Sequence, residues 1–312
     1  MKRCVLSIVV LLSTAGWATA HTVGFATHTF TYQTADGTSK EMRVAMWYPS
    51  SGSTSTVVYA YVSGQVVPDG AVLDGPWPLV VHSHGAWSCG LSSAYLNQSL
   101  AAAGYVIAAP DHEDAASCLI GGGQAPYADW TQTMGRRPEE LRAVIDEVFE
   151  LNRTPGSAFH GKIDELKVSA SGHSLGGWAA GTLSPAHATG DSRVKTLLLW
   201  SPSARLDQSF YGQLQSPVMY LFGQYDATAF SSAFRTWAYD ATPPPKFLSY
   251  VAAATHYSFT DLPCQFYRTV ENCSNNPTAA TILRYSRAFL DWYLKDDQTT
   301  NSILKTMELY ER

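Results

Sequence analysis

Short apolar runs alternate along the chain with segments whose apolar residues recur every three or four positions. The apolar runs are typical of strands, and the three-to-four period is typical of helices. One helical segment spans 138–151, and the apolar residues on one of its faces are Leu141, Val144, Ile145, Val148 and Phe149. Strands that alternate with helices predict an α/β fold with a mostly parallel central sheet flanked by helices.

The predicted strands and helices cover most of the chain after residue 78. The strands are Leu79–Ser83, Val106–Ala109, Lys167–Ser171, Val194–Trp200, Pro217–Phe222 and Lys246–Val251. A helix is predicted over 91–103, and a closing helix begins at Pro277, with Ile282, Tyr285, Phe289, Trp292 and Tyr293 along one face.

Two segments, Ser50–Pro78 and Ser117–Gly135, lack periodicity. The second follows a predicted strand at its carboxyl end, the edge at which α/β sheets bind ligands. Ser117–Gly135 is therefore either a mobile rim of a binding pocket or an inert surface loop.

Residues 1–20 have the features of a secretory signal peptide. Lys2 and Arg3 precede the apolar run Val5–Leu12, and Ala18-Thr19-Ala20 provides a small-residue cleavage site. The apolar run is too short to span a bilayer, and no later run reaches that length. We therefore expect a secreted or periplasmic protein without stable membrane insertion, whose residues 21–312 form a single domain.

Charge and cysteine content narrow the class of protein further. Loss of Lys2 and Arg3 with the leader changes the net charge from −5 to −7, which argues against nucleic acid as a partner. Four cysteines remain after the leader, and an even number in an exported chain favours disulfides. Three connectivities are open. From their positions near neighbouring predicted strands and loops, we predict the pairs Cys264–Cys273 and Cys89–Cys118.

The segment Gly172-His173-Ser174-Leu175-Gly176 fits the G-x-S-x-G pattern and directly follows a predicted strand. This is the context of a nucleophile elbow, in which a serine stands at a sharp strand-to-helix turn. Small residues are needed on either side because a Cβ would crowd the crossing backbone. We predict Ser174 as the nucleophile and the amide N–H of Leu175 as one donor to an acyl oxyanion.

In chains with such an elbow, the acid and then the histidine follow the serine. Only His187 and His256 lie after Ser174. His187 is expected at an exposed helix end, whereas His256 follows the strand Lys246–Val251 and is predicted to be the general base.

The acid must orient the imidazole from the end of a strand, which favours Asp226. Asp207 is the second choice, because some hydrolases carry the acid one strand earlier. Asp261 follows His256 and breaks the order. Asp207 and Asp261 are otherwise interpreted as solvated loop residues.

A second oxyanion donor is expected in the loop after an earlier central strand. Gly85 follows the strand Leu79–Ser83 and allows a sharp turn, so the amide of Ala86 is the candidate. A weaker alternative interprets several side chains of this region as metal ligands: His82, His84, Asp111, His112 and Asp114. Because a serine triad needs no metal, no metal or other cofactor is predicted.

Three strings carry a resemblance to a known family: VVHSHGAW, LAAAGYVIAAPDHEDAA and IDELKVSASGHSLGG. Together they resemble the α/β-hydrolases grouped with platelet-activating factor acetylhydrolase and the dienelactone hydrolase-related esterases. The likeness runs from about Arg43 through the THYSFTDL segment.

The resemblance implies an α/β-hydrolase fold with Ser174, Asp226 and His256 as the triad and Ala86 and Leu175 as oxyanion donors. Tyr257 and Ser258, which follow His256, depart from the family pattern. Serine at position 174 argues against dienelactone hydrolase activity, which uses cysteine.

These features predict a secreted serine ester hydrolase acting through an acyl-enzyme. Short-chain acyl or phospholipid-type esters are the first choice of substrate, and a polyester, as for a cutinase-like enzyme, is the second. The alternative from another class is a non-catalytic binding module on a hydrolase scaffold, which would be expected to lack a triad member. Trp87, Trp130 and Trp178 could line an aromatic cleft, although core packing explains Trp178 equally well.

Overall fold

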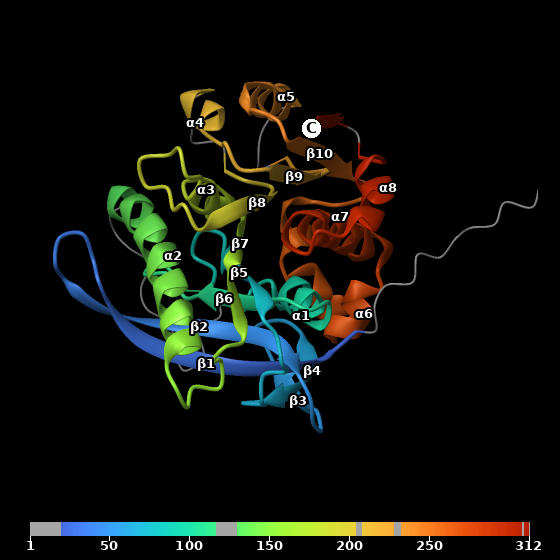
Figure 1. Cartoon of the computed structure of the whole chain (residues 1–312). Coiled ribbons are helices and arrows are strands. Elements are labelled where there is room, and N and C mark those ends of the chain that lie inside the picture. The colour runs from blue at the N-terminus through green and yellow to red at the C-terminus, as the bar shows by residue number, and fades with distance from the viewer. Residues whose placement is uncertain (1–19, 117–129, 204–207, 228–231, 308, 312) are drawn as a thin grey trace, which may run out of the picture.

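The computed structural model describes residues 20–116, 130–203, 208–227, 232–307 and 309–311. In this part of the chain, eleven strands form one sheet in the order β11-β10-β9-β8-β7-β5-β6-β2-β1-β4-β3 (Figure 1). The strands are β1 (Thr22–Gln33), β2 (Ser39–Ser50), β3 (Ser55–Val58), β4 (Ser63–Pro68), β5 (Trp77–Ser83), β6 (Val106–Pro110), β7 (Ile163–His173), β8 (Val194–Trp200), β9 (Val218–Gly223), β10 (Lys246–Val251) and β11 (Leu309–Glu311).

The centre of the sheet is parallel and its flanks contain antiparallel pairs. Neighbouring strands from β6 through β10 all run in one direction, whereas β2 pairs with β6 and β11 with β10 in the opposite direction. Parallel strands end at the same edge of a sheet, so the loops after β5, β7, β9 and β10 meet there. The predicted α/β architecture with a mostly parallel sheet is confirmed, and the sheet is mixed because antiparallel strands extend it.

Helices cover both faces of the sheet (Figure 1). On one face lie α1 (Ala94–Ala102), α6 (Val270–Ser274) and α7 (Pro277–Leu294), and on the other lie α2 (Trp130–Arg153) and α3 (Leu175–Gly181). The remaining helices are α4 (Gln208–Gly212), α5 (Ser232–Ala241), α8 (Asn301–Leu304) and the 3-10 turns η1 (His256–Phe259), η2 (Pro263–Phe266) and η3 (Gln298–Thr300). Among the described residues, no helix combines the length and apolar character needed to cross a membrane.

Two apolar cores lie between these layers, one on each face of the sheet. The predicted apolar face of 138–151 is buried in one of them, where Leu141, Val144 and Ile145 have no exposed surface. Ile282 and Phe289 of α7 are buried in the other. Full burial of such a side chain contributes about 1.5–3 kcal/mol, so these helix faces fix how α2 and α7 lie on the sheet.

Several elements differ from the sequence-based prediction. Strand β1 was not predicted, and residues 50–78, interpreted as irregular, contain β3 and β4. These short strands lie at the edge of the sheet and expose about half of their residues, so they carry no apolar run. Helix α2 starts at Trp130, so residues 130–135 of the segment Ser117–Gly135, interpreted as a rim or a surface loop, are helical, and Pro138 lies within the helix rather than at its first turn.

Candidate active site

Ser174 lies at the turn between β7 and α3, in the segment Gly172–Gly176, which we call the elbow. Its main chain has φ 54° and ψ −119°, a conformation that costs a non-glycine residue about 1–3 kcal/mol. Neighbouring backbone enforces it: the Ser174 N–H donates to the Trp200 carbonyl at 3.0 Å, and the Ser174 carbonyl accepts from the Ser203 N–H at 2.8 Å. The structure thus has the predicted sharp strand-to-helix turn, with Ser174 at its apex.

Close backbone packing requires the two outer glycines of the elbow. A Cβ at Gly172 would lie 2.2 Å from the main-chain oxygen of Gly176, and a Cβ at Gly176 would lie 2.0 Å from the main-chain oxygen of Ser83. Neither approach is sterically allowed. The second contact also brings the elbow against the end of β5.

His256 and Asp226 are hydrogen-bonded to each other. His256 Nδ1 lies 3.1 Å from Asp226 Oδ2, and the Asp226 side chain is fully buried whereas that of His256 is 12% exposed. A buried carboxylate that accepts from Nδ1–H leaves Nε2 unprotonated and able to receive a proton. This is the tautomer that a general base requires.

Close packing of the ends of β9 and β10 brings these two residues together. A Cβ at Gly223 would lie 2.7 Å from the main-chain oxygen of Ala254, so only glycine allows this approach. The Tyr225 N–H donates to that same oxygen at 2.8 Å. As a result, Asp226 lies directly beside the loop that carries His256.

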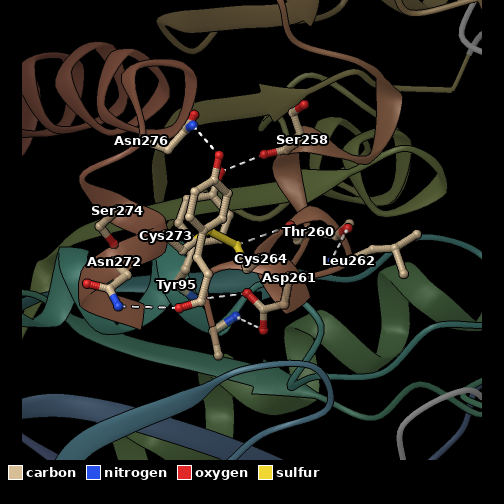
Figure 2. The surroundings of a disulfide bond; sticks show 12 residues. Tyr95, Ser258, Thr260, Asp261, Leu262, Cys264, Asn272, Cys273, Ser274 and Asn276 are labelled. Carbon is tan, nitrogen blue, oxygen red and sulfur yellow. Dashed lines mark hydrogen bonds between the residues drawn. A yellow bond between two sulfur atoms is a disulfide. The ribbon is translucent and has the colours of Figure 1, made fainter. Parts of the chain in front are cut away.

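The segment Thr255–Leu262, which we call the β10 loop, is held by the start of α1 (Figure 2). The two oxygens of Asp261 accept from the N–H groups of Ala94 and Tyr95 at 2.9 and 3.0 Å, and the Tyr95 hydroxyl donates to the Ser258 carbonyl at 2.6 Å. Four orphan amides are expected at a helix start, and Asp261 satisfies two of them. The position of His256 is thereby linked to a helix that precedes it by more than 150 residues.

The interpretation of Asp261 as a solvated loop residue is wrong. Its side chain is completely buried, and burial raises the pKa of Asp261 to about 8 even though the Tyr95 and Ala94 amides favour its charged form. Chain position alone could not reveal this, because the partners belong to α1.

The predicted disulfide between Cys264 and Cys273 is present (Figure 2), with a Cα–Cα distance of 5.3 Å. It joins η2 to α6 immediately beyond the β10 loop. Cys89 is also disulfide-bonded. Cys118 lies outside the described residues, so its pairing with Cys89 stays a prediction.

A cavity of about 360 Å³ opens where the elbow, the β10 loop and the segment His84–Trp87, which we call the β5 loop, meet. Ser174 and His256 line it together with Ala86. Leu175, the first residue of α3, adjoins Ser174 at the positive end of that helix. In the described part of the chain, neither the Ala86 nor the Leu175 amide N–H has a protein acceptor. Both amides are therefore available to an oxygen atom of a ligand.

Three exposed aromatic side chains lie at the mouth of this cavity: Tyr61, Trp87 and Tyr257. Their exposed fractions are 37%, 51% and 50%. Trp178, by contrast, is buried in α3 and takes no part in the mouth, which agrees with core packing. The side chain of Trp130 and residues 117–129 lie outside the described part of the chain.

The residues considered as metal ligands have other partners. His82 Nδ1 lies 3.1 Å from Ser171 Oγ, and Asp111 pairs with Arg43 at 3.1 Å. His112 contacts Glu140 at 2.6 Å, and Asp114 pairs with Arg137 at 2.7 Å. Within the described ranges, no group of three or more His, Cys, Asp or Glu side chains could hold a metal ion.

Of the two remaining candidates from the sequence, only His187 lies in the described part of the chain, and it is not among the residues that line the cavity. His187 lies in a turn after α3, where its Nδ1 is 3.0 Å from Thr189 Oγ1. Asp207 lies outside the described residues, so the choice of Asp226 over Asp207 rests on the bond from Asp226 to His256.

His173 has a role that sequence reasoning missed. It is buried, its Nε2–H donates to the His256 carbonyl at 2.9 Å, and the two imidazole rings are 4.6 Å apart. Burial and the neighbouring His256 keep the pKa of His173 well below its usual value, so it stays neutral. The position of His173 between Gly172 and Ser174 was the one signal in the sequence that it lies near the site. Its hydrogen-bond partner, the His256 carbonyl, is apparent only in the folded structure.

Comparisons with known proteins agree with this architecture. Residues 79–305 match the alpha/beta hydrolase family. The match covers most of the chain, and the protein therefore belongs to that family and has the α/β-hydrolase fold. The range includes the elbow, Asp226 and His256.

Among solved structures, a ferulic acid esterase from Streptomyces cinnamoneus matches with a TM-score of 0.67 and 23% sequence identity, over 90% of this chain and 93% of that chain. This likeness concerns the fold. No curated protein matches the sequence.

Proposed function

We propose that this protein is a serine carboxylic-ester hydrolase that acts through an acyl-enzyme. The observation that carries the proposal is that Ser174 in its strained turn, His256 bonded to buried Asp226, and Ala86 with its unpartnered amide line one cavity. The unpartnered amide of Leu175 directly follows Ser174 at the start of α3. A non-catalytic module would have no need to retain all of them.

Each group has a defined task in the reaction. Ser174 Oγ attacks the ester carbonyl carbon while its proton passes to His256 Nε2, and the carbonyl oxygen becomes an oxyanion that accepts from the Ala86 and Leu175 N–H groups. The bond to the alcohol then breaks, and His256 returns its proton to the leaving oxygen. Water repeats the sequence on the acyl-enzyme, releases the acid and regenerates Ser174. Asp226 stabilises the imidazolium form of His256 in both halves.

The cavity volume favours a small acyl group. About 360 Å³ lies near the lower end of small-molecule pockets, and this space must hold both the acyl and the alcohol part of the ester. Short-chain acyl esters, including phospholipid-type esters with a short acyl chain, are therefore the first choice of substrate.

The aromatic mouth favours a second candidate, a polyester. Tyr61, Trp87 and Tyr257 present flat apolar surface to solvent around the cavity, and such rings bind extended apolar or aromatic chains. A chain-length series of nitrophenyl esters, measured beside release of soluble product from a polyester film, separates the two candidates.

Replacement of the nucleophile is the direct test of the proposal. Ser174→Ala should remain folded and lose several orders of magnitude in kcat for nitrophenyl acetate, because the triad works as a unit. Asp226→Asn should lower kcat by about 10⁴ through the wrong imidazole tautomer. Ser302→Ala and Asp296→Asn, which alter exposed positions of the same residue types, are the matched controls.

Covalent labelling provides a second measurement. A fluorophosphonate should modify Ser174, as located by peptide mass spectrometry, and a metal chelator should leave the rate unchanged. If Ser174→Ala retains more than about a tenth of the activity, the nucleophile lies elsewhere.

We also propose that residues 1–20 are removed on export. The charged start of the chain and the Cys264–Cys273 disulfide support an oxidising compartment. N-terminal sequencing of the exported protein should then begin at His21.

A further inference from the structure

Arg137 of α2 is fully buried and contacts the β5 loop, but it is not among the residues that line the cavity. Its guanidinium donates to the carbonyl of His84 and, at 3.1 Å, to the carbonyl of Gly85. Burial of an arginine is costly unless its donors are satisfied. Here every contact falls on the β5 loop or on residues that support it.

The contact with Gly85 bears directly on the Ala86 amide. The Gly85 carbonyl and the Ala86 N–H belong to one planar peptide unit and point in opposite directions. A group that fixes the oxygen therefore also fixes the direction of the N–H. Arg137 binds the oxygen, and Ala86 lines the cavity.

His84 provides the second donor to the same oxygen. Its Nε2 accepts from the His112 N–H at 3.2 Å, so the proton is on Nδ1, which donates to the Gly85 carbonyl at 2.7 Å. Burial, and then the charge of Arg137, keep the pKa of His84 well below its usual value, which maintains this neutral form.

Asp114 completes the support. Its two oxygens accept from Arg137 Nε at 3.0 Å and from Nη2 at 2.7 Å, and Oδ2 also accepts from the Trp87 N–H at 3.1 Å. The Arg137–Asp114 pair thus holds the loop on both sides of Ala86: its carbonyls before that residue and an amide after it.

We propose that Arg137 is a positioning residue for ester hydrolysis, which orients and polarises the Gly85–Ala86 peptide so that the Ala86 N–H is preset toward the oxyanion. The inference rests on the proposed function. A positive charge beside the Gly85 carbonyl makes the Ala86 N–H a stronger hydrogen-bond donor. Because the donor is already oriented, no free energy is spent on reorienting it when the oxyanion forms.

Arg137→Lys tests the inference because it keeps the charge but cannot serve both carbonyls and both Asp114 oxygens. Loss of a whole oxyanion donor lowers kcat by about 10²–10³. A loosened donor should lower kcat for nitrophenyl acetate by about 10- to 100-fold, with kcat expressed per active site as titrated by the fluorophosphonate. KM should stay within about threefold of wild type, because the ground-state ester makes little use of the donor.

A trifluoromethyl ketone gives the readout that a merely structural role would not move. It adds to Ser174 and forms an oxyanion, so its inhibition constant should rise by the same factor as kcat falls. Arg136→Lys is the matched control, since the neighbouring Arg136 pairs with Asp36 and Glu139 away from the β5 loop. Its kcat and inhibition constant should stay within about twofold of wild type.

The outcomes separate the inference from the proposed function. A wild-type protein that neither hydrolyses esters nor labels at Ser174 overturns both. An active wild type with Arg137→Lys at wild-type kcat and inhibition constant overturns the inference alone. If Arg137→Lys does not fold, Asp114→Asn provides the same readouts: a fall in kcat matched by weaker ketone binding supports the inference, and wild-type values refute it.

Discussion

The elbow and the β5 loop lie side by side at the cavity. The residues that fix their conformations differ in how far away they lie along the chain. Within the elbow, Gly172 packs against the backbone of Gly176, only four residues later, and Gly176 packs in turn against the backbone of Ser83. The β5 loop is held by Arg137 and Asp114, which follow Gly85 and Trp87 by 52 and 27 residues. Close backbone packing requires glycines at fixed spacing, which form a motif in the sequence, whereas ionic support from distant residues forms no motif.

The β10 loop resembles the β5 loop in this respect. Its anchors are the start of α1, which no motif beside His256 indicates, and the Cys264–Cys273 disulfide, which the sequence predicts. Of the three segments that form the site, only the elbow carries a local glycine motif that reveals its turn. The predictions below act on these supports one at a time.

The largest effect is expected where the elbow and the β5 strand touch. Gly176→Ala places a Cβ 2.0 Å from the Ser83 carbonyl oxygen and should separate the two regions. We expect a loss of about 3 kcal/mol in unfolding free energy and at least a hundredfold loss of esterase activity. Denaturant unfolding measures the change in unfolding free energy, and kcat of the folded fraction measures the change in activity.

Gly135→Ala is the matched control, because a Cβ there meets no atom within 4 Å and the residue lies in α2. It should be neutral or stabilise by up to about 1 kcal/mol. Equal losses in the two variants would show that the elbow contact has no special role.

The next effect concerns the β10 loop. Replacement of Cys264 and Cys273 by serine removes a bridge that spans nine positions, and chain entropy predicts a loss of about 3 kcal/mol. Activity should be lost at a lower temperature than the temperature at which the sheet unfolds, because the loop that carries His256 loosens first. Parallel thermal scans of activity and far-UV circular dichroism measure the gap. Coincident transitions would contradict a local role for the bridge.

The last prediction tests the contrast between steric and ionic support through the pH dependence of stability. Glu140 is fully buried and contacts His112 at 2.6 Å and Tyr32 at 3.2 Å, and the His112 N–H donates to His84 of the β5 loop. Burial raises the pKa of Glu140 to about 7, although the charge of Arg137 opposes the rise.

The folded protein therefore keeps this proton between about pH 4.5 and 7, where the unfolded chain has lost it. Stability must fall as the pH rises through that window, by up to about 3 kcal/mol from this group. Glu140→Gln mimics the protonated form and should flatten the fall in unfolding free energy between pH 5 and 8. An unchanged slope would assign the pH dependence to other groups. The steric elbow contributes no such dependence.

Sequence reasoning reached the parts of the fold that depend on neighbouring residues. The strands Val194–Trp200 and Lys246–Val251 have the predicted bounds, and the apolar faces of α2 and α7 are buried as expected. Edge strands β3 and β4 were missed because half-exposed strands carry no continuous apolar run. The early start of α2 was missed because Pro138 is typical of a first helical turn.

In the site, too, features that depend on neighbouring residues could be predicted, and features that depend on distant residues could not. Glycine spacing in G-H-S-L-G and the order of Ser174, Asp226 and His256 could be read directly from the chain, since a tight turn excludes side chains within a few residues and the strand order is regular. Arg137, His173 and the anchoring role of Asp261 emerged only in three dimensions. Their partners come from other elements, and burial, which makes a hydrogen bond or an ion pair matter, is a property that a side chain acquires only when distant segments pack around it.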